Sequence, residues 1–214
     1  RIALRAAAPS LDWPRMFREP IVLSGADAEV DWRRDGRDWV LAAPDVVLSH
    51  PQASARGGFE LRLDPGLRSP VLALDARVDR LDAALVPRVL PLGRLKPRTI
   101  VWLESAFQSG HASNGRVSYR GPVRRFPFRN GEGEFIASAA VGDVRLDYFD
   151  GFAPLTEGTG TIEFHNASLR AAVDAGSVGG LRLRGATLAI ADLKQPVLEI
   201  GAQASGDVAA ALAV

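Results

Sequence analysis

Side chains of the types that carry catalysis or hold metal ions are scattered in this sequence. His50, His111 and His165 stand singly and the chain contains no cysteine, so the ligand spacing of a zinc site is absent. Glu132 and Glu134 stand two residues apart, which on a strand places both carboxylates on one polar, solvated face. We therefore expect no metal site, no cofactor and no catalytic pair of carboxylates.

Motifs for nucleophilic or phosphate chemistry are missing as well. Gly131 and Gly133 frame a short glycine-rich loop, but the lysine, the serine or threonine and the following helix of a phosphate-binding loop are lacking. Ser105 does not stand in a G-x-S-x-G context. No nucleophile, base and orienting partner can be assembled from these residues. The sequence therefore predicts a protein without catalytic residues, which is not an enzyme.

A cluster of arginines surrounds the sequence Phe126-Pro127-Phe128. A positive loop beside exposed aromatic rings can bind an anionic lipid head group or a membrane surface. The alternative is that the arginines only keep the loop soluble. The candidate head-group or membrane contacts are Arg120, Arg124, Arg125, Phe126, Phe128 and Arg129.

The composition is that of an ordinary folded protein. Of 214 residues, 47% are hydrophobic and 24% are charged, and 26 Lys+Arg against 25 Asp+Glu leave a net charge of +1. Nucleic-acid-binding proteins normally carry a clear basic excess, so we expect no nucleic-acid partner. No apolar run approaches the ~20 residues of a membrane-spanning helix. The chain starts at Arg1 with its one methionine at position 16, and we interpret it as a piece of a longer protein whose anchor lies elsewhere.

Alternating apolar and polar residues, the pattern of half-buried β-strands, recur along most of the chain. The clearest examples are Glu134–Val141 and Val144–Tyr148, each with one apolar face. Gly142-Asp143 between them has turn chemistry, so we expect a hairpin there. Asp35-Gly36 predicts a second hairpin, which joins Ala26–Trp32 to a strand that begins at Trp39.

The strand pattern is interrupted once, between residues 81 and 110. Leu81–Leu90 is compatible with a short helix, and in Arg98–Ser109 the apolar residues fall at helical spacing between a proline and a glycine. We therefore divide the chain into a β segment over 1–80, a helical insertion over 81–110 and a second β segment over 111–214. Other one-faced strands are expected over Arg1–Ala6, Asp45–Leu48, Phe59–Leu63, Leu72–Val78, Gly115–Gly121, Thr161–His165, Leu169–Val173, Leu181–Leu183, Leu188–Ile190 and Leu198–Ile200.

So many one-faced strands with so few helices predict a mainly β fold with an elongated, curved and twisted sheet. Helices cannot cover all the apolar faces, so the sheet must fold on itself or leave an apolar trough. The pattern alone leaves open whether this face is a groove or a closed core. Strand parity assigns these candidate groove residues: Val117, Tyr119, Phe135, Val141, Leu146, Tyr148, Ile162, Phe164, Leu169, Leu181, Leu183, Leu188 and Ile190.

The order and spacing of several short motifs resemble the YhdP-like members of the AsmA-like family of bacterial envelope proteins. The motifs are Trp102-Leu103, Tyr119-Arg120-Gly121, Phe126-Pro127-Phe128, Gly131 to Phe135 and Ile190 to Leu193, and the resemblance covers residues 85–214. It implies a periplasmic body, anchored in the inner membrane of Gram-negative bacteria, whose curved β-groove moves phospholipid between the inner and outer membranes.

Residues and resemblance together predict a non-enzymatic, lipid-conducting segment. Its expected partners are phospholipid and, through parts of the full-length protein not present here, the membranes. The alternative is a structural or ligand-binding β-sandwich or β-helix domain of an envelope protein. That alternative requires a filled interior and no apolar trough open to solvent.

Overall fold

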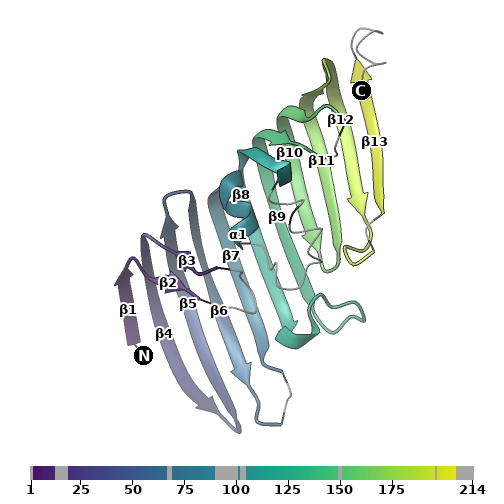
Figure 1. Cartoon of the computed structure of the whole chain (residues 1–214). Coiled ribbons are helices and arrows are strands. Elements are labelled where there is room, and N and C mark those ends of the chain that lie inside the picture. The colour runs from purple at the N-terminus through teal and green to yellow at the C-terminus, as the bar shows by residue number, and fades with distance from the viewer. Residues whose placement is uncertain are drawn as a thin grey trace.

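The computed structural model describes residues 2–12, 19–66, 69–89, 101, 105–148, 151–195 and 197–205. In these residues one antiparallel sheet of eleven strands dominates, and its strands follow one another in chain order (Figure 1). The short strands β2 (Ser10–Leu11) and β3 (Ile21–Val22) pair separately with each other.

The long strands are joined mostly by short connections, as in a meander. A 3-10 turn, η1 (Ala83–Leu85), and the helix α1 (Val86–Val89) lie between β7 and β8, and a second turn, η3 (Val123–Arg125), lies between β8 and β9. The strands of the large sheet are β1 (Ile2–Ala7), β4 (Gly25–Asp35), β5 (Asp38–His50), β6 (Ala53–Leu63), β7 (Val71–Asp82), β8 (Phe107–Pro122), β9 (Glu134–Leu146), β10 (Leu155–His165), β11 (Ser168–Val178), β12 (Leu181–Ile190) and β13 (Leu198–Ser205).

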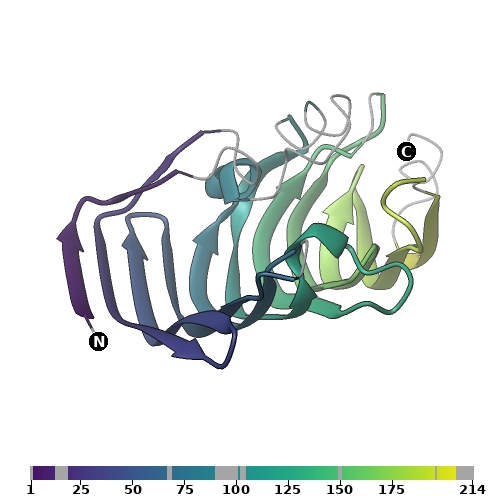
Figure 2. The ribbon, with the colours of Figure 1, turned by 90° about the horizontal axis from the view of Figure 1, so that it is seen from below.

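The large sheet is open, with β1 and β13 at its two ends (Figures 1 and 2). The 22.9 kDa chain has an accessible surface of 13711 Å², whereas a compact monomer of that mass exposes about 9,600 Å². The described side chains that are buried and apolar are few: Ile21, Val40, Ala43, Ala83, Leu85, Ala106, Phe128, Leu155, Val178 and Ala186. The predicted mainly β, elongated, curved sheet is confirmed, and the described residues contain no second large sheet of the kind a β-sandwich requires.

Bulges give the sheet its curvature. A bulge inserts an extra residue into one strand, bends it and increases its twist. Three non-glycine residues inside the long strands have the left-handed backbone of such irregularities: Asn114 (φ 52), Asp143 (φ 52) and Glu157 (φ 53). Register shifts lie between Ala28 and Asp31, Ala43 and Val46, Ser54 and Ala55, Ser113 and Arg116, Gly158 and Gly160, and Arg184 and Thr187.

The hairpin predicted at Gly142-Asp143 is wrong. Both residues lie inside β9, which runs without reversal from Glu134 to Leu146, and Asp143 supplies a bulge in place of a turn. Glycine, together with an aspartate that tolerates a left-handed backbone, serves either feature equally well. The chain reverses after β9, before β10 begins at Leu155.

The predicted Asp35-Gly36 turn is confirmed, because Asp35 pairs with Asp38 and Gly36 has a φ of 61°. The helix predicted over Arg98–Ser109 lies mostly outside the described residues. Its predicted end is wrong, since only Ser105 and Ala106 of its last described residues are helical and β8 begins at Phe107. That aromatic residue pairs with Leu146 in the sheet, and tertiary pairing overrides the helical spacing.

Candidate functional site

One row of apolar residues crosses the entire large sheet. Residues that are partners in register point to the same face of a sheet, so the strand pairs can be followed from edge to edge. The row is Leu4, Ala28, Val46, Gly57, Ala76, Val117, Ala137, Phe164, Leu169, Ile190 and Leu198, one residue from each strand. Every member is apolar, and we call this row and the rows beside it the apolar face.

The rows beside it have the same character. On the β4–β9 part of the sheet they contain Ala43, Phe59, Leu74, Tyr119 and Phe135, and then Trp32, Leu41, Leu61, Leu72 and Gly121. On the other side of the first row lie Ala139, Ile162, Ala171, Leu188 and Ile200. The apolar face is therefore several residues wide.

All thirteen sequence-predicted groove residues are half-buried. Tyr119 pairs with Phe135, and Phe164 lies in the first row together with Leu169 and Ile190. Val117 belongs to the same row, and Ile162 and Leu188 belong to the row next to it.

Three further predicted groove residues lie outside these rows. Val141 pairs with Gly160, and Leu146 pairs with the buried Leu155. The ring of Tyr148 lies 6.4 Å from that of Phe152.

Leu181 and Leu183 lie beyond the irregularity at Gly185 in β12, and there they alternate with exposed arginines.

The opposite face of the sheet is charged and carries ion pairs between neighbouring strands. Arg62 contacts Asp35 at 3.0 Å and Asp38 at 3.2 Å, and these hydrogen bonds raise the pKa of the guanidinium. Arg120 bonds Asp75 and thereby lowers the pKa of that carboxyl group. Exposed pairs of this kind contribute little to stability, but they mark this face as the solvated one.

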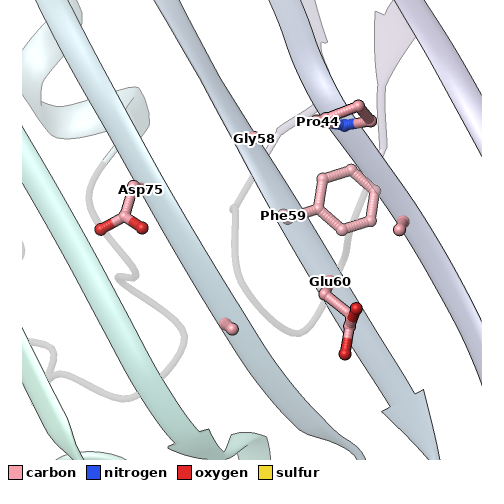
Figure 3. Close-up of a pocket in the computed structure, with 7 residues that line it drawn as sticks. Pro44, Gly58, Phe59, Glu60 and Asp75 are labelled. Carbon is pink, nitrogen blue, oxygen red and sulfur yellow. The ribbon is translucent and has the colours of Figure 1, made fainter.

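A shallow pocket on the sheet offers no free chemical group. Its lining comprises Ala42, Pro44, Gly58, Phe59, Glu60, Ala73 and Asp75 (Figure 3). Glu60 contacts Arg33 at 3.1 Å, and Asp75 is bonded to Arg120. Both carboxylates are thus already neutralised by arginines.

Residues 123–133, which we call the aromatic loop, connect β8 to β9 and fold back onto the sheet. The ring of Phe126 lies 5.3 Å from that of Phe135, and the ring of Phe128 lies 5.1 Å from that of Tyr119. Phe128 is only 2% exposed. The two phenylalanines of the loop therefore pack against predicted groove residues at one end of the strands.

An ion pair ties the aromatic loop to the far part of the sheet. Arg129 Nη2 lies 2.6 Å from Asp192 Oδ1, in the connection between β12 and β13. Hydrogen bonding to Arg129 is the main cause of a lowered pKa for Asp192, and the pKa of Arg129 is raised in return. The Phe135 amide also donates to Asn166 Oδ1 at 2.8 Å. The loop is thereby held across the ends of the strands that lie between β9 and β12.

The six predicted head-group contacts thus separate into three kinds. Arg120 and Arg129 are engaged by carboxylates, whereas Phe126 and Phe128 lie on the sheet. Arg124 and Arg125 are exposed. Neither of these two has a carboxylate partner within 4.0 Å in the described part of the chain.

The sequence analysis missed a group of candidate residues at the tip of the β4–β5 hairpin. Trp32 and Trp39 are 57% and 43% exposed, and their ring centroids lie 5.9 Å apart. The Asp35-Gly36 turn was the available signal, because a hairpin closed there pairs Trp32 with Leu41 and Arg34 with Trp39.

The described residues contain no group of three or more histidine, aspartate or glutamate side chains that could hold a metal ion. No helix among them is long and apolar enough to cross a membrane.

Comparison with known proteins identifies the family of this chain. It is 24% identical over 196 residues to the intermembrane phospholipid transporter YhdP of Escherichia coli (strain K12), an alignment that covers 92% of this chain and 15% of that protein. The chain thus spans about a seventh of the length of this relative. No solved structure matches it. The family model for YhdP protein matches residues 1–214, and the chain therefore belongs to the YhdP family, as its motifs predicted.

Proposed function

We propose that this chain is a non-enzymatic, lipid-conducting segment, on whose apolar face the acyl chains of phospholipid lie and slide. The observation that carries the proposal is the unbroken apolar row across eleven strands, many of whose side chains are half-buried. Membership in a family with an intermembrane phospholipid transporter supports phospholipid as the cargo.

The dimensions of the row suit a sliding acyl chain. Ten inter-strand spacings of about 4.8 Å make the row about 48 Å long. An acyl chain spans about half of the ~30 Å hydrocarbon core of a bilayer, so the row is about three chain lengths long. Exposing a 16-carbon chain to water costs roughly 12 kcal/mol at about 0.8 kcal/mol per methylene. A continuous apolar surface removes much of that cost at every position along the way.

Such transport requires neither a cofactor nor a catalytic residue, because no covalent bond changes. Head groups stay at the solvated edge of the face, where Arg124 and Arg125 of the aromatic loop are available to their phosphates. The thirteen predicted groove residues and the three segments 1–80, 81–110 and 111–214 then form one continuous part of a longer periplasmic conduit. The membrane anchor and membrane contacts belong to other parts of the full-length protein.

Two adjacent residues of β9 allow a matched test. Ala137 lies in the apolar row, and Ser138 pairs with Glu163 on the charged face. Ala137→Asp places a carboxylate in the lipid path, whereas Ser138→Asp adds the same charge on the solvated side. Native mass spectrometry with lipid identification, on chains shown to be folded by circular dichroism, should find co-purified phospholipid reduced about tenfold or more in Ala137→Asp, since burying a carboxylate without a partner is strongly unfavourable. Ser138→Asp should retain the lipid of the unchanged protein.

Equal lipid content in the two variants would contradict the proposal. A well-folded, lipid-free chain after gentle purification would do so as well, and would favour a structural β domain of the cell envelope.

A further inference from the structure

The tip of the β4–β5 hairpin combines exposed aromatic surface with Arg34, an arginine that forms no ion pair with a described residue. Arg34 lies over the ring of Trp39, with its guanidinium carbon 6.0 Å from the ring centroid. Trp32 adds a second ring 5.9 Å from the first. Tryptophan has an apolar body and a polar N–H, and such side chains are enriched where an apolar region meets water.

These three residues continue the apolar face to its edge. Arg34 pairs with Trp39, which pairs with Leu63, and Trp32 pairs with Leu41 one row further in. Among the described residues of the apolar face and of the row Arg34, Trp39 and Leu63, Arg34 is the single charged member. A charge is therefore placed where the apolar surface ends.

The guanidinium of Arg34 is oriented and still has donors to offer. Its Nε donates to the Gly36 carbonyl at 3.1 Å, which leaves the two Nη groups directed elsewhere. Arg33 on the charged face contacts Asp31 and Glu60. In contrast, no carboxylate of the described residues lies within 4.0 Å of the Arg34 guanidinium. An arginine stacked on an aromatic ring is a preorganised, weakly hydrated donor for phosphate.

We propose that Arg34, Trp32 and Trp39 form a phospholipid head-group site at the edge of the apolar face. This inference rests on the proposed lipid-conducting function and assigns it a specific contact. The guanidinium binds the lipid phosphate, the indole rings lie at the level of the glycerol esters, and the acyl chains extend over Leu41 and Leu61. A phosphate without acyl chains makes the contact with the guanidinium but not the contact with Leu41 and Leu61.

The site lies at the same end of the strands as the aromatic loop, as Figure 1 shows for the β4–β5 turn and the β8–β9 connection. The row that starts at Trp32 leads through Leu61 and Leu72 to Gly121. A Cβ placed on Gly121 would come within 3.0 Å of the Phe128 ring, so this row ends beneath the aromatic loop. From β4, which carries Arg34, to β8 there are four spacings, about 19 Å. Head groups bound at Arg34 and at Arg124 and Arg125 would therefore occupy one common edge.

The test uses dihexanoylphosphatidylglycerol below its micelle concentration and a chain labelled with 5-fluorotryptophan. Fluorine NMR resolves the tryptophans, which are assigned by single Trp→Phe changes. The lipid should shift the resonances of Trp32 and Trp39. Arg34→Gln should weaken the binding that these resonances report by about three- to fivefold, as expected for a partly exposed ionic contact. Arg37→Gln, in the turn of the same hairpin, is the matched control and should leave the affinity unchanged.

Three outcomes would overturn the site: no shift at either tryptophan, equal effects of Arg34→Gln and Arg37→Gln, or equally tight binding of glycerol phosphate, which would indicate a general anion site. The proposed function is tested separately by Ala137→Asp. If that change removes co-purified lipid while Arg34→Gln leaves the tryptophan shifts intact, the conduit stands and the head-group site falls.

Discussion

Ala137 and Ser138 are neighbours on β9, yet they belong to different surfaces. Ala137 pairs with Phe164 in the apolar row, and Ser138 pairs with Glu163 among charged residues. Because side chains alternate along a strand, a shift of one residue in register would move apolar side chains to the solvated face. At the residue scale, the proposed function therefore depends on register. A bulge changes the parity of a strand where it bends, so apolar side chains on both sides of the bulge stay on one face.

Gly133 is a residue whose size fixes the aromatic loop. A Cβ at this position would come within 2.8 Å of the Phe128 ring and would also overlap the Arg120 carbonyl oxygen. We expect Gly133→Ala to destabilise β8 and β9 by about 1–3 kcal/mol through overpacking, measured as the local opening free energy of their amides by hydrogen exchange. Gly25→Ala is the control, since its nearest atom is 4.0 Å away. Equal effects of the two changes would show that neither the Arg120 carbonyl nor the Phe128 ring constrains this site.

At the element scale, alternation predicted most strands and the parity of pairs such as Tyr119 with Phe135, because that signal is local. It did not predict that β5 continues through Pro44 or that β9 continues through Gly142-Asp143. Proline, glycine and aspartate mark bulges as well as turns, and the choice depends on the neighbouring strands. The folding of the aromatic loop onto the sheet also escaped prediction, since Arg129 and Asp192 lie 63 residues apart.

The ion pair of the aromatic loop should respond to pH. The pKa of Asp192 is lowered by Arg129 in the folded chain, so its stabilising effect is present above the ordinary aspartate pKa of about 3.9 and is lost as pH falls through the lower folded value. We expect Asp192→Asn to raise the hydrogen-exchange rate of residues 123–133 about two- to fivefold at neutral pH. In the unchanged protein, the same increase should occur only below about pH 4, after correction for intrinsic exchange rates.

Asp174→Asn, on β11, should leave the loop unaffected, because no ion pair joins that carboxylate to a described residue. An aromatic loop equally protected in Asp192→Asn and in the unchanged protein would mean that its rings alone hold it in place.

In the described residues the large sheet is a single layer of strands, each of which pairs with at most two neighbours. In this respect it resembles repeat proteins, whose stability is approximately a sum of local terms and nearest-neighbour terms. β1 is exposed along all six residues, whereas buried side chains such as Phe128, which packs on β8, and Leu155 of β10 lie in the middle of the sheet. Stability should therefore decrease from the middle of the sheet towards both edges. An open apolar face is compatible with folding because each strand of the large sheet is paired with its neighbours, and under the proposed function lipid would cover that face.

Hydrogen exchange with and without lipid tests this view of the molecule. Without lipid, amides of β7 to β10 should be the most protected, and those of β1 and β13 the least. Saturating phospholipid at about 100 times its dissociation constant should add up to about 2.7 kcal/mol to every opening that releases it. Because the apolar row reaches both edges through Leu4 and Leu198, added protection should extend over the whole sheet in the unchanged protein and disappear in Ala137→Asp. Protection confined to β8 and β9 would instead indicate a local binding pocket, in which lipid is held at one position and does not travel along the row.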